Sequence, residues 1–328
     1  MELLKNFFKT GKEPEAPIGQ PEEMERHFIK PEKENGLAEI KKNYREAIKS
    51  REDQYDADVA AKPEIKNQRP LLETHNEIVL GYGAELVRAH ALSEEDKAAV
   101  YLAIIFHDSG KLASPLLEHH LKGMEYAEKM LDKITPIKQG EEIIAPTPEL
   151  KEKILNAIMR HMNHPFLVKA KKGERFSEPE NEIDKIVFDA DMMANVGFKN
   201  VCFRLINESY FNEDADAAQG KGITTLEETF NNVMSGVREL GEVVLTGPAK
   251  ERTSELVEAA EKILEFLKEK NIFREIQDKY SINGEYNFAS VKEAPGGVQA
   301  LKQDLNSAML KAAKELGIEE KIVKNFIM

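Results

Sequence analysis

The chain has 328 residues, of which 41% are hydrophobic and 32% charged, so it can bury a sizeable core beneath a well-solvated surface. Its formal net charge of −13 argues against non-specific binding to nucleic acid or to an anionic membrane. The single cysteine, Cys202, excludes an internal disulfide, and the sequence shows neither a signal peptide nor an apolar run of about 18 residues. We therefore expect a cytoplasmic protein without a membrane span.

The N-terminal part of the chain is polar. Residues 1 to about 35 are rich in Pro, Glu and Lys and show little periodicity, which predicts a mobile or surface-draped extension. A polar helix is expected near Leu37–Arg51, followed by a connector from Tyr55 to Pro70. We assign residues 1–65 to an N-terminal extension on this basis.

The pattern changes at Leu71, where apolar residues begin to recur at helical spacing. The segment AAVYLAIIFHD is nearly all apolar towards its end, which predicts a central, buried helix ending at His107-Asp108. Another predicted helix runs from Ser114-Pro115 to about Ile134, and a third from Thr147-Pro148 to near Met162. Ser or Thr N-caps are expected at Ser93 with Asp96, at Ser114, at Thr147, and at Ser177 with Glu180.

The remaining chain is also predominantly helical by pattern. We expect helices near 198–211, 224–241, 248–270 and 297–316, and a short strand pair around Tyr280–Val291. No sustained strand alternation occurs in the middle of the chain. The prediction is an all-α fold: an irregular helical bundle over residues 66–245, with a helical C-terminal extension over 246–328.

Histidines are unevenly distributed. Five of the eight lie between residues 107 and 164, and His75 lies in the helix just before. The pair His107-Asp108 ends the apolar helix and is followed by Ser-Gly-Lys, so two polar groups are expected in a buried place. Buried polar groups need partners, and an imidazole next to a carboxylate is a good ligand pair for a divalent metal.

The order of His75, the HDSGK segment and a distant Asp in FDADMMANVG resembles the HD-domain superfamily of metal-dependent phosphohydrolases, over roughly residues 70–245. The resemblance implies a helical fold that brings His75, His107, Asp108 and Asp191 to one metal. Asp189 is the alternative for the last ligand. The run Met-Met-Ala after Asp191 departs from the Arg that often follows this Asp in the family, so the substrate class is not carried over.

A second set of residues resembles the dinuclear branch of the same superfamily. The segment EHHLKGMEYA implies His119 as a further ligand, and the position of His161 implies another. His120 and His164 are the respective alternatives. Lys111 of the HDSGK turn is expected near the substrate phosphate. The basic stretch KAKKGERFS is expected to form a flexible anion-attracting rim, through Lys169, Lys171, Lys172 and Arg175.

The sequence therefore predicts a phosphohydrolase, a phosphomonoesterase or phosphodiesterase acting on nucleotides or another small phosphate ester through metal-activated water. Asp108 and Lys111 are the predicted catalytic residues. One or two divalent ions are expected, among Mn, Fe, Co, Ni, Zn and Mg. The alternatives are a di-iron oxygenase of the same superfamily and a non-enzymatic, metal-stabilised sensor or scaffold. A small phosphorylated molecule is the expected partner, and the oligomeric state is left open.

Overall fold

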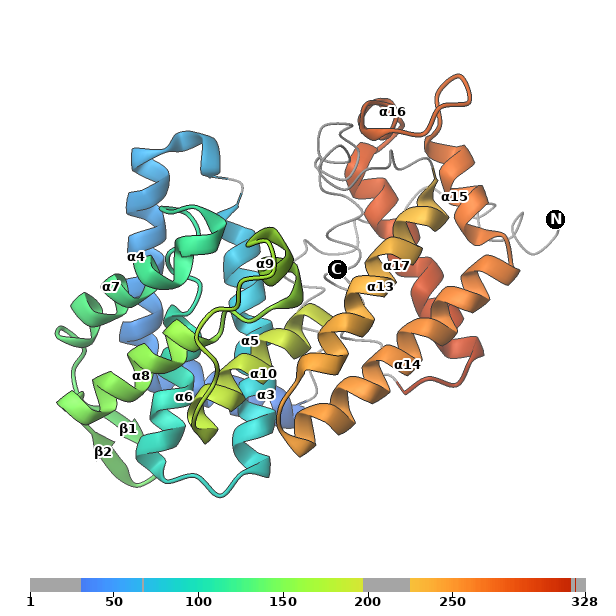
Figure 1. Ribbon diagram of the computed structural model, residues 1–328. Coiled ribbons are helices and arrows are strands. Elements are labelled where there is room, and N and C mark those ends of the chain that lie inside the picture. The colour runs from blue at the N-terminus through green and yellow to red at the C-terminus, as the bar shows by residue number, and fades with distance from the viewer. Residues whose placement is uncertain (1–30, 67, 197–224, 320–321, 323–328) are drawn as a thin grey trace.

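A computed structural model describes residues 31–66, 68–196, 225–319 and 322, which form helices joined by short loops (Figure 1). The all-α prediction is confirmed. Among these residues, no helix combines the length and the apolar character needed to cross a membrane. The longer helices are α3 (Pro31–Asn43), α4 (Arg45–Ala61), α5 (Arg69–Ala89), α6 (Glu94–Phe106), α7 (His119–Leu131), α8 (Pro148–Arg160), α10 (Glu182–Val196), α13 (Leu226–Val243), α14 (Gly247–Glu269) and α17 (Gly297–Glu315).

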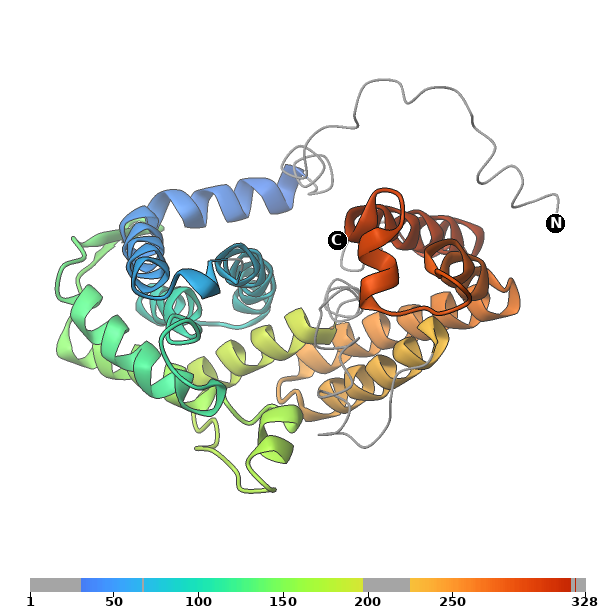
Figure 2. The same ribbon diagram turned by 90° about the horizontal axis from the view of Figure 1, so that it is seen from above.

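The helices form two groups, seen side by side in both views (Figures 1 and 2). One group holds α3 to α10, and the other holds α13 to α17 with the shorter helices α15 (Ile272–Tyr280) and α16 (Phe288–Glu293). Helix α10 joins them, because it packs against α5, α6 and α8 as well as against α13 and α14. The buried apolar residues form a continuous core through both groups. The predicted division of the chain at about residues 65 and 245 stays a prediction.

Helix α6 occupies the centre of the first group, as predicted. Its N-cap is Ser93, whose hydroxyl oxygen accepts a hydrogen bond from the backbone N–H of Asp96. Every residue from Ala98 to Phe106 is buried, and the helix is surrounded by α4, α5, α7, α8 and α10. A helix that is apolar on all sides can sit only in the core, which fixes the position of the polar residues that follow it.

The N-terminal helices differ from the prediction. Instead of one helix over Leu37–Arg51 and a connector from Tyr55, α3 and α4 run through to Ala61, and a short 3-10 turn, η1 (Pro63–Ile65), leads to α5. Helix α4 buries Ala47, Arg51 and Tyr55. An arginine in the buried row masks the helical periodicity, so the sequence looks like a polar connector where the helix continues.

Helix α7 also begins later than predicted. The Ser114 hydroxyl does not cap it but donates to the carbonyl oxygen of Gly110, closing the turn after α6. A 3-10 turn, η2 (Leu116–Glu118), comes first, and α7 begins at His119. Ser114-Pro115 therefore belongs to the turn that follows α6 and does not mark the start of α7.

Two predicted N-caps have different outcomes. Thr147 caps α8 as predicted, with its side chain accepting from the N–H of Leu150. The predicted cap of α10 by Ser177 is wrong, because the helix begins at Glu182 and the Asn181 side-chain oxygen accepts from the N–H of Asp184. Asn is as good an N-cap as Ser, and it lies at the start of the buried stretch.

The strands were mispredicted in both places. A short antiparallel ribbon, β1 (Ile137–Gln139) and β2 (Glu142–Ile144), lies between α7 and α8 and pairs buried Ile137 with Ile144. Strands of three residues are too short to show alternation. The predicted pair at Tyr280–Val291 reduces to one bridge between Ile282 and Glu285, after which α16 begins. The predicted helix near 198–211 lies outside the described residues, whereas α13, α14 and α17 match their predicted ranges closely.

Candidate metal centre

Five segments that are far apart in the chain meet at the C-terminal end of α6. His75 comes from α5, His107 and Asp108 from the turn after α6, His119 from the first residue of α7, His161 from the end of α8, and Asp191 from α10. All of them except His75 are buried, and the His75 side chain is 19% exposed. The cluster is therefore closed on most sides and opens near His75.

Two glycines allow the turn after α6 to touch α7. A Cβ atom on Gly110 would lie 2.1 Å from the carbonyl oxygen of His119 and 2.8 Å from the backbone nitrogen of Gly123. A Cβ atom on Gly123 would lie 3.1 Å from the carbonyl oxygen of His107. Only glycines permit this approach of two backbones. This contact explains why the Asp-Ser-Gly turn and the His-x-x-x-Gly helix are needed to bring His119 next to Asp108.

The first group of potential ligands consists of His75, His107 and Asp108, whose ligand atoms all lie within 4.8 Å of one another. The Nε2 atoms of His75 and His107 are each 3.5 Å from Oδ2 of Asp108. Asp191 lies beside this group, with its Oδ1 atom 3.0 Å from Nε2 of His75 and 3.8 Å from Nε2 of His107. The two imidazoles of His75 and His107 and the two carboxylates of Asp108 and Asp191 therefore lie close together.

The second group consists of Asp108, His119 and His161. Oδ1 of Asp108 lies 3.3 Å from Nε2 of His119 and 3.9 Å from Nε2 of His161. Asp108 therefore belongs to both groups, with one carboxylate oxygen facing each. A carboxylate in this position could bridge two cations.

Each buried imidazole is oriented by the helix end that carries it. The Nδ1 atoms of His107, His119 and His161 lie 2.5 to 2.7 Å from the backbone carbonyl three residues earlier. Because a carbonyl only accepts, Nδ1 must carry the proton, and Nε2 is left with a lone pair that faces the cluster. A hydrogen bond from the second ring nitrogen to a carbonyl is the usual support of a metal-ligating histidine.

The protonation states suit cation binding. Burial lowers the pKa of His107 and lowers that of His161 well below its ordinary value, so both rings are neutral. Burial by itself raises the pKa of Asp108, but the neighbouring His107 and Lys111 hold it well below the ordinary value. Asp191 behaves similarly, since the hydrogen bond to His75 outweighs its burial and lowers its pKa. Neutral imidazoles and ionised carboxylates are the forms that bind metal.

Some buried polar atoms of the cluster have no hydrogen-bond partner among the described residues. Nε2 of His119 and Nε2 of His161 are 3.1 Å apart, and when both rings are neutral with the proton on Nδ1, two lone pairs face each other. Nε2 of His107 and Oδ1 of Asp108 are buried without a hydrogen-bond partner among the described residues. Leaving such atoms unpaired is costly, and a divalent cation would satisfy all of them. The residues present therefore fit a metal.

The comparison with family models identifies this part of the chain. Residues 72–196 match the HD domain. The chain contains an HD domain. This family is one of metal-dependent hydrolases, and the match includes every residue of both potential ligand groups and Asp191. No curated protein and no solved structure gives a significant match to the chain. The match covers the helices that carry the potential ligands, while α3, α4 and α13 to α17 lie outside the matched residues.

The alternatives to three predicted ligands lie elsewhere. Asp189 binds the start of α14: its carboxylate accepts from the N–H groups of Leu245 and Thr246 and from the Thr246 hydroxyl. His164 caps the short helix α9 (Pro165–Ala170), with its Nδ1 accepting from the N–H of Phe166. His120 packs edge-on against Phe176, and burial lowers its pKa to about 4. Asp191, His161 and His119 therefore stay the candidate ligands.

Lys111 and the basic stretch are placed differently. Nζ of Lys111 lies 2.6 Å from Oδ2 of Asp108, at the edge of the cluster. In the basic stretch, Lys171 lies over the ring of Phe176, which contacts His120. Arg175 forms an exposed ion pair with Glu178, 2.7 Å away. Lys169 likewise pairs with Glu239, so much of the predicted rim has carboxylate partners of its own.

Two supporting residues were not recognised in the sequence. The Asn195 side chain donates to Oδ1 of Asp191 at 3.0 Å, one turn further along α10. Asn76, fully buried beside His75, donates to the backbone carbonyl of Ile104 and ties α5 to the end of α6. Their positions in the sequence were the available signals, because Asn76 directly follows His75 and Asn195 lies four residues after Asp191 on the same helix.

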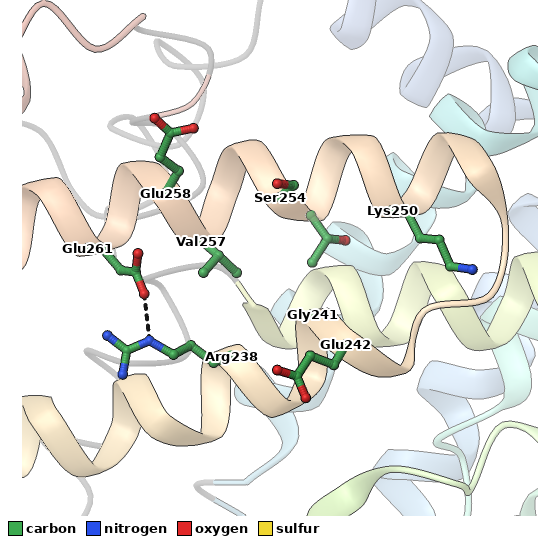
Figure 3. A pocket seen from close by; sticks show the side chains of 9 residues that line it. Arg238, Gly241, Glu242, Lys250, Ser254, Val257, Glu258 and Glu261 are labelled. Atoms are coloured by element: carbon green, nitrogen blue, oxygen red, sulfur yellow. Dashed lines mark hydrogen bonds and ion pairs between the residues drawn. The ribbon is translucent and has the colours of Figure 1, made fainter.

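A separate hollow lies on the surface between α13 and α14 (Figure 3). Its lining is mixed in charge, and Arg238 and Glu261 form an ion pair across it at 2.5 Å. Lys250 and Glu258 also face it. It shares no residue with either potential ligand group.

Proposed function

We propose that this protein is a metal-dependent phosphohydrolase acting on a small phosphate ester, with a nucleotide as the expected substrate. The observation that carries the proposal is the position of Asp108, whose two carboxylate oxygens face two groups of imidazoles. Such a pair of adjoining groups suits a pair of divalent cations, and two adjacent cations are a common arrangement for phosphoryl transfer to water.

We assign the metal-binding residues accordingly. His75, His107, Asp108 and Asp191 would hold one ion, and His119, His161 and Asp108 would hold the second. When bound, such ions lower the pKa of a water ligand and polarise a phosphoryl oxygen. The cluster contains imidazole and carboxylate ligands, so its chemistry does not select one ion among Mn, Fe, Co, Ni, Zn and Mg.

The protein's own contribution is orientation and charge. The backbone carbonyls behind His107, His119 and His161 fix the tautomer of each ring. Lys111 holds a positive charge beside Asp108, where it would stabilise negative charge that develops on the transferring phosphoryl group. Burial excludes bulk water around Asp108 and thereby strengthens these interactions.

The test is a screen of phosphorylated metabolites for phosphate release by chelated protein, with Mn²⁺, Co²⁺, Mg²⁺ or Fe²⁺ added singly. Phosphate release with a redox-inert ion such as Mg²⁺ supports the proposal. Turnover that requires iron and consumes O₂ would instead favour the di-iron oxygenase. A protein that retains metal but converts none of the substrates would fit the sensor or scaffold.

Kinetics separate Lys111 from the basic stretch. We expect Lys111→Ala to lower kcat by about ten- to a thousandfold, as expected for loss of a charge that stabilises the transition state. Replacing Lys171, Lys172 and Arg175 together should raise KM and weaken the salt dependence of kcat/KM while leaving kcat nearly unchanged. An unchanged kcat in the first variant removes Lys111 from the site. An unchanged KM in the second leaves the stretch as a solvated loop.

A further inference from the structure

Arg51 of helix α4 carries a buried guanidinium group with unused hydrogen-bond donors. It is only 3% exposed, and its Nε and Nη1 atoms have no hydrogen-bond partner among the described residues. Its guanidinium lies 5.8 Å from the centroid of the Tyr55 ring, one turn further along the helix. The nearby carboxylate of Glu73 is held by Arg69, whose Nε atom lies 3.0 Å away.

Unused donors on a buried charged group are unfavourable. Guanidinium groups in protein interiors are normally paired with carboxylate or phosphate, and a buried cation that loses such a partner is strongly destabilising. Arginine does not lose its proton in proteins, so it cannot escape the cost by becoming neutral. A buried arginine with free donors therefore indicates a place where an anion or another acceptor binds.

Helix α4 lies next to two helices that carry part of the metal centre. It packs against α6, which ends directly before His107-Asp108, and against α7, which begins with His119. Tyr44, the residue before α4, contacts Tyr101 of α6 with ring centroids 5.7 Å apart, and Asp58 of α4 accepts a hydrogen bond from Tyr126 of α7. Arg51 lies between these two contacts, on the buried side of α4.

Tyr55 supports the same placement independently. Its ring is fully buried, and its hydroxyl has no hydrogen-bond partner among the described residues. Burial raises the pKa of Tyr55, and the charge of Asp108 raises it further, so the phenol stays protonated and acts as a donor near that carboxylate. The two side chains together offer guanidinium and hydroxyl donors to one acceptor group.

We propose that Arg51 and Tyr55 bind the terminal phosphate of the substrate beside the metal centre, so that the substrate is a phosphomonoester. The inference rests on the proposed phosphohydrolase function. A phosphomonoester carries up to two negative charges, which suit a buried guanidinium and the nearby Lys111. A phosphodiester carries only one negative charge and would match these cationic groups less well.

The probe is inorganic phosphate, titrated by calorimetry into the full-length protein loaded with Mn²⁺, with dimethyl phosphate as the diester comparison. The variants are Arg51→Gln and Tyr55→Phe, which keep most of the packing volume. Arg45→Gln on the exposed face of the same helix is the matched control for loss of a positive charge. Thermal unfolding without phosphate and metal analysis accompany each titration, so that a folding or metal-binding defect is recognised.

We expect wild type and Arg45→Gln to bind phosphate more tightly than dimethyl phosphate. Arg51→Gln should weaken phosphate binding about 10- to 100-fold and Tyr55→Phe by a smaller factor, the usual effect of losing hydrogen bonds to a charged group. KM for a phosphomonoester should rise in parallel. If Arg51→Gln does not fold, Tyr55→Phe alone decides the matter.

Two results overturn the proposal. One is an unchanged phosphate Kd in folded, metal-loaded variants, which would make Arg51 a packing residue. The other is equal or tighter binding of dimethyl phosphate by wild type. Both are distinct from failure of the phosphohydrolase proposal, which is absence of phosphate release by wild type with every metal. Phosphate binding that depends on Arg51 in a protein without turnover supports the anion subsite while refuting the enzyme.

Discussion

Asp189 and Asp191 lie two residues apart on α10, and their substitution should separate stability from metal binding. Asp189 accepts hydrogen bonds from the N–H of Leu245 at 2.7 Å, and from the N–H and hydroxyl of Thr246 at 2.8 and 2.7 Å. It therefore ties α10 to the first turn of α14. Asp191 points to the other side, towards His75.

The magnitude follows from these contacts. A hydrogen bond to a charged group contributes about 1.5–3 kcal/mol, but the three share one carboxylate and cannot be summed in full. The backbone of the partly exposed Leu245 can regain a bond to water. We expect Asp189→Ala to lower the free energy of unfolding by about 3 kcal/mol, which corresponds to a Tm lower by roughly 4–6 °C for a chain of this length. Metal content should not change.

Asp191→Ala should give the opposite pattern: loss of metal, with a smaller change of Tm in chelated protein. The assay is thermal unfolding in chelator, combined with mass-spectrometric metal analysis after reconstitution with Mn²⁺. Asn195→Ala is a graded companion, because it removes the hydrogen bond to Oδ1 of Asp191 while leaving the carboxylate in place. Full metal occupancy in Asp191→Ala, or loss of metal in Asp189→Ala at an unchanged Tm, would refute this division of roles.

Three further predictions concern the centre itself. Asp108→Ala should lose all bound metal and all activity while keeping its helical circular dichroism, and full occupancy would remove Asp108 from the ligands. Gly110→Ala should displace His119, because the added Cβ would lie 2.1 Å from the carbonyl oxygen of His119. The number of metal ions bound per protein should therefore fall. An unchanged number would contradict the argument from this close contact. Burial lowers the pKa of His161 below the 6.5 of the unfolded chain, so the unfolded state binds the proton first as pH falls. Urea unfolding in chelator should therefore show stability falling from pH 7 to pH 5, less steeply in His161→Gln, and identical slopes would count against it.

The errors in the secondary-structure prediction share a cause. Helix α4 was ended too early because Arg51 and Asp58 interrupt the apolar row, although Arg51 is buried and Asp58 accepts from Tyr126. The start of α7 was misplaced because Ser114 and Pro115 are equally suitable for a tight turn. The local sequence pattern reflects the average polarity of a helix face. It does not record which polar side chains find partners in the folded protein.

The sequence by itself determined the helical class, the buried α6 and the residues able to bind a metal. Nine consecutive apolar residues followed by His107-Asp108 require a central helix that ends in polar groups, and the caps at Ser93 and Thr147 set two helix starts. These features depend on residue type and spacing along a single helix, so no knowledge of neighbouring elements was needed.

Only the tertiary structure decided which residue of each pair of alternative ligands, such as Asp189 and Asp191, faces the candidate metal centre. Asp189 and Asp191 are 200° apart around α10, yet both are buried, one against α14 and the other against α5. Whether a buried carboxylate meets backbone N–H groups or imidazoles depends on the packing of helices that are distant in sequence. The same holds for Arg51, which the sequence placed on a polar helix and which the packing of α4 against α6 and α7 buries. The periodicity of a sequence indicates which face of a helix is buried. Which other helices pack on that face is decided only by the fold.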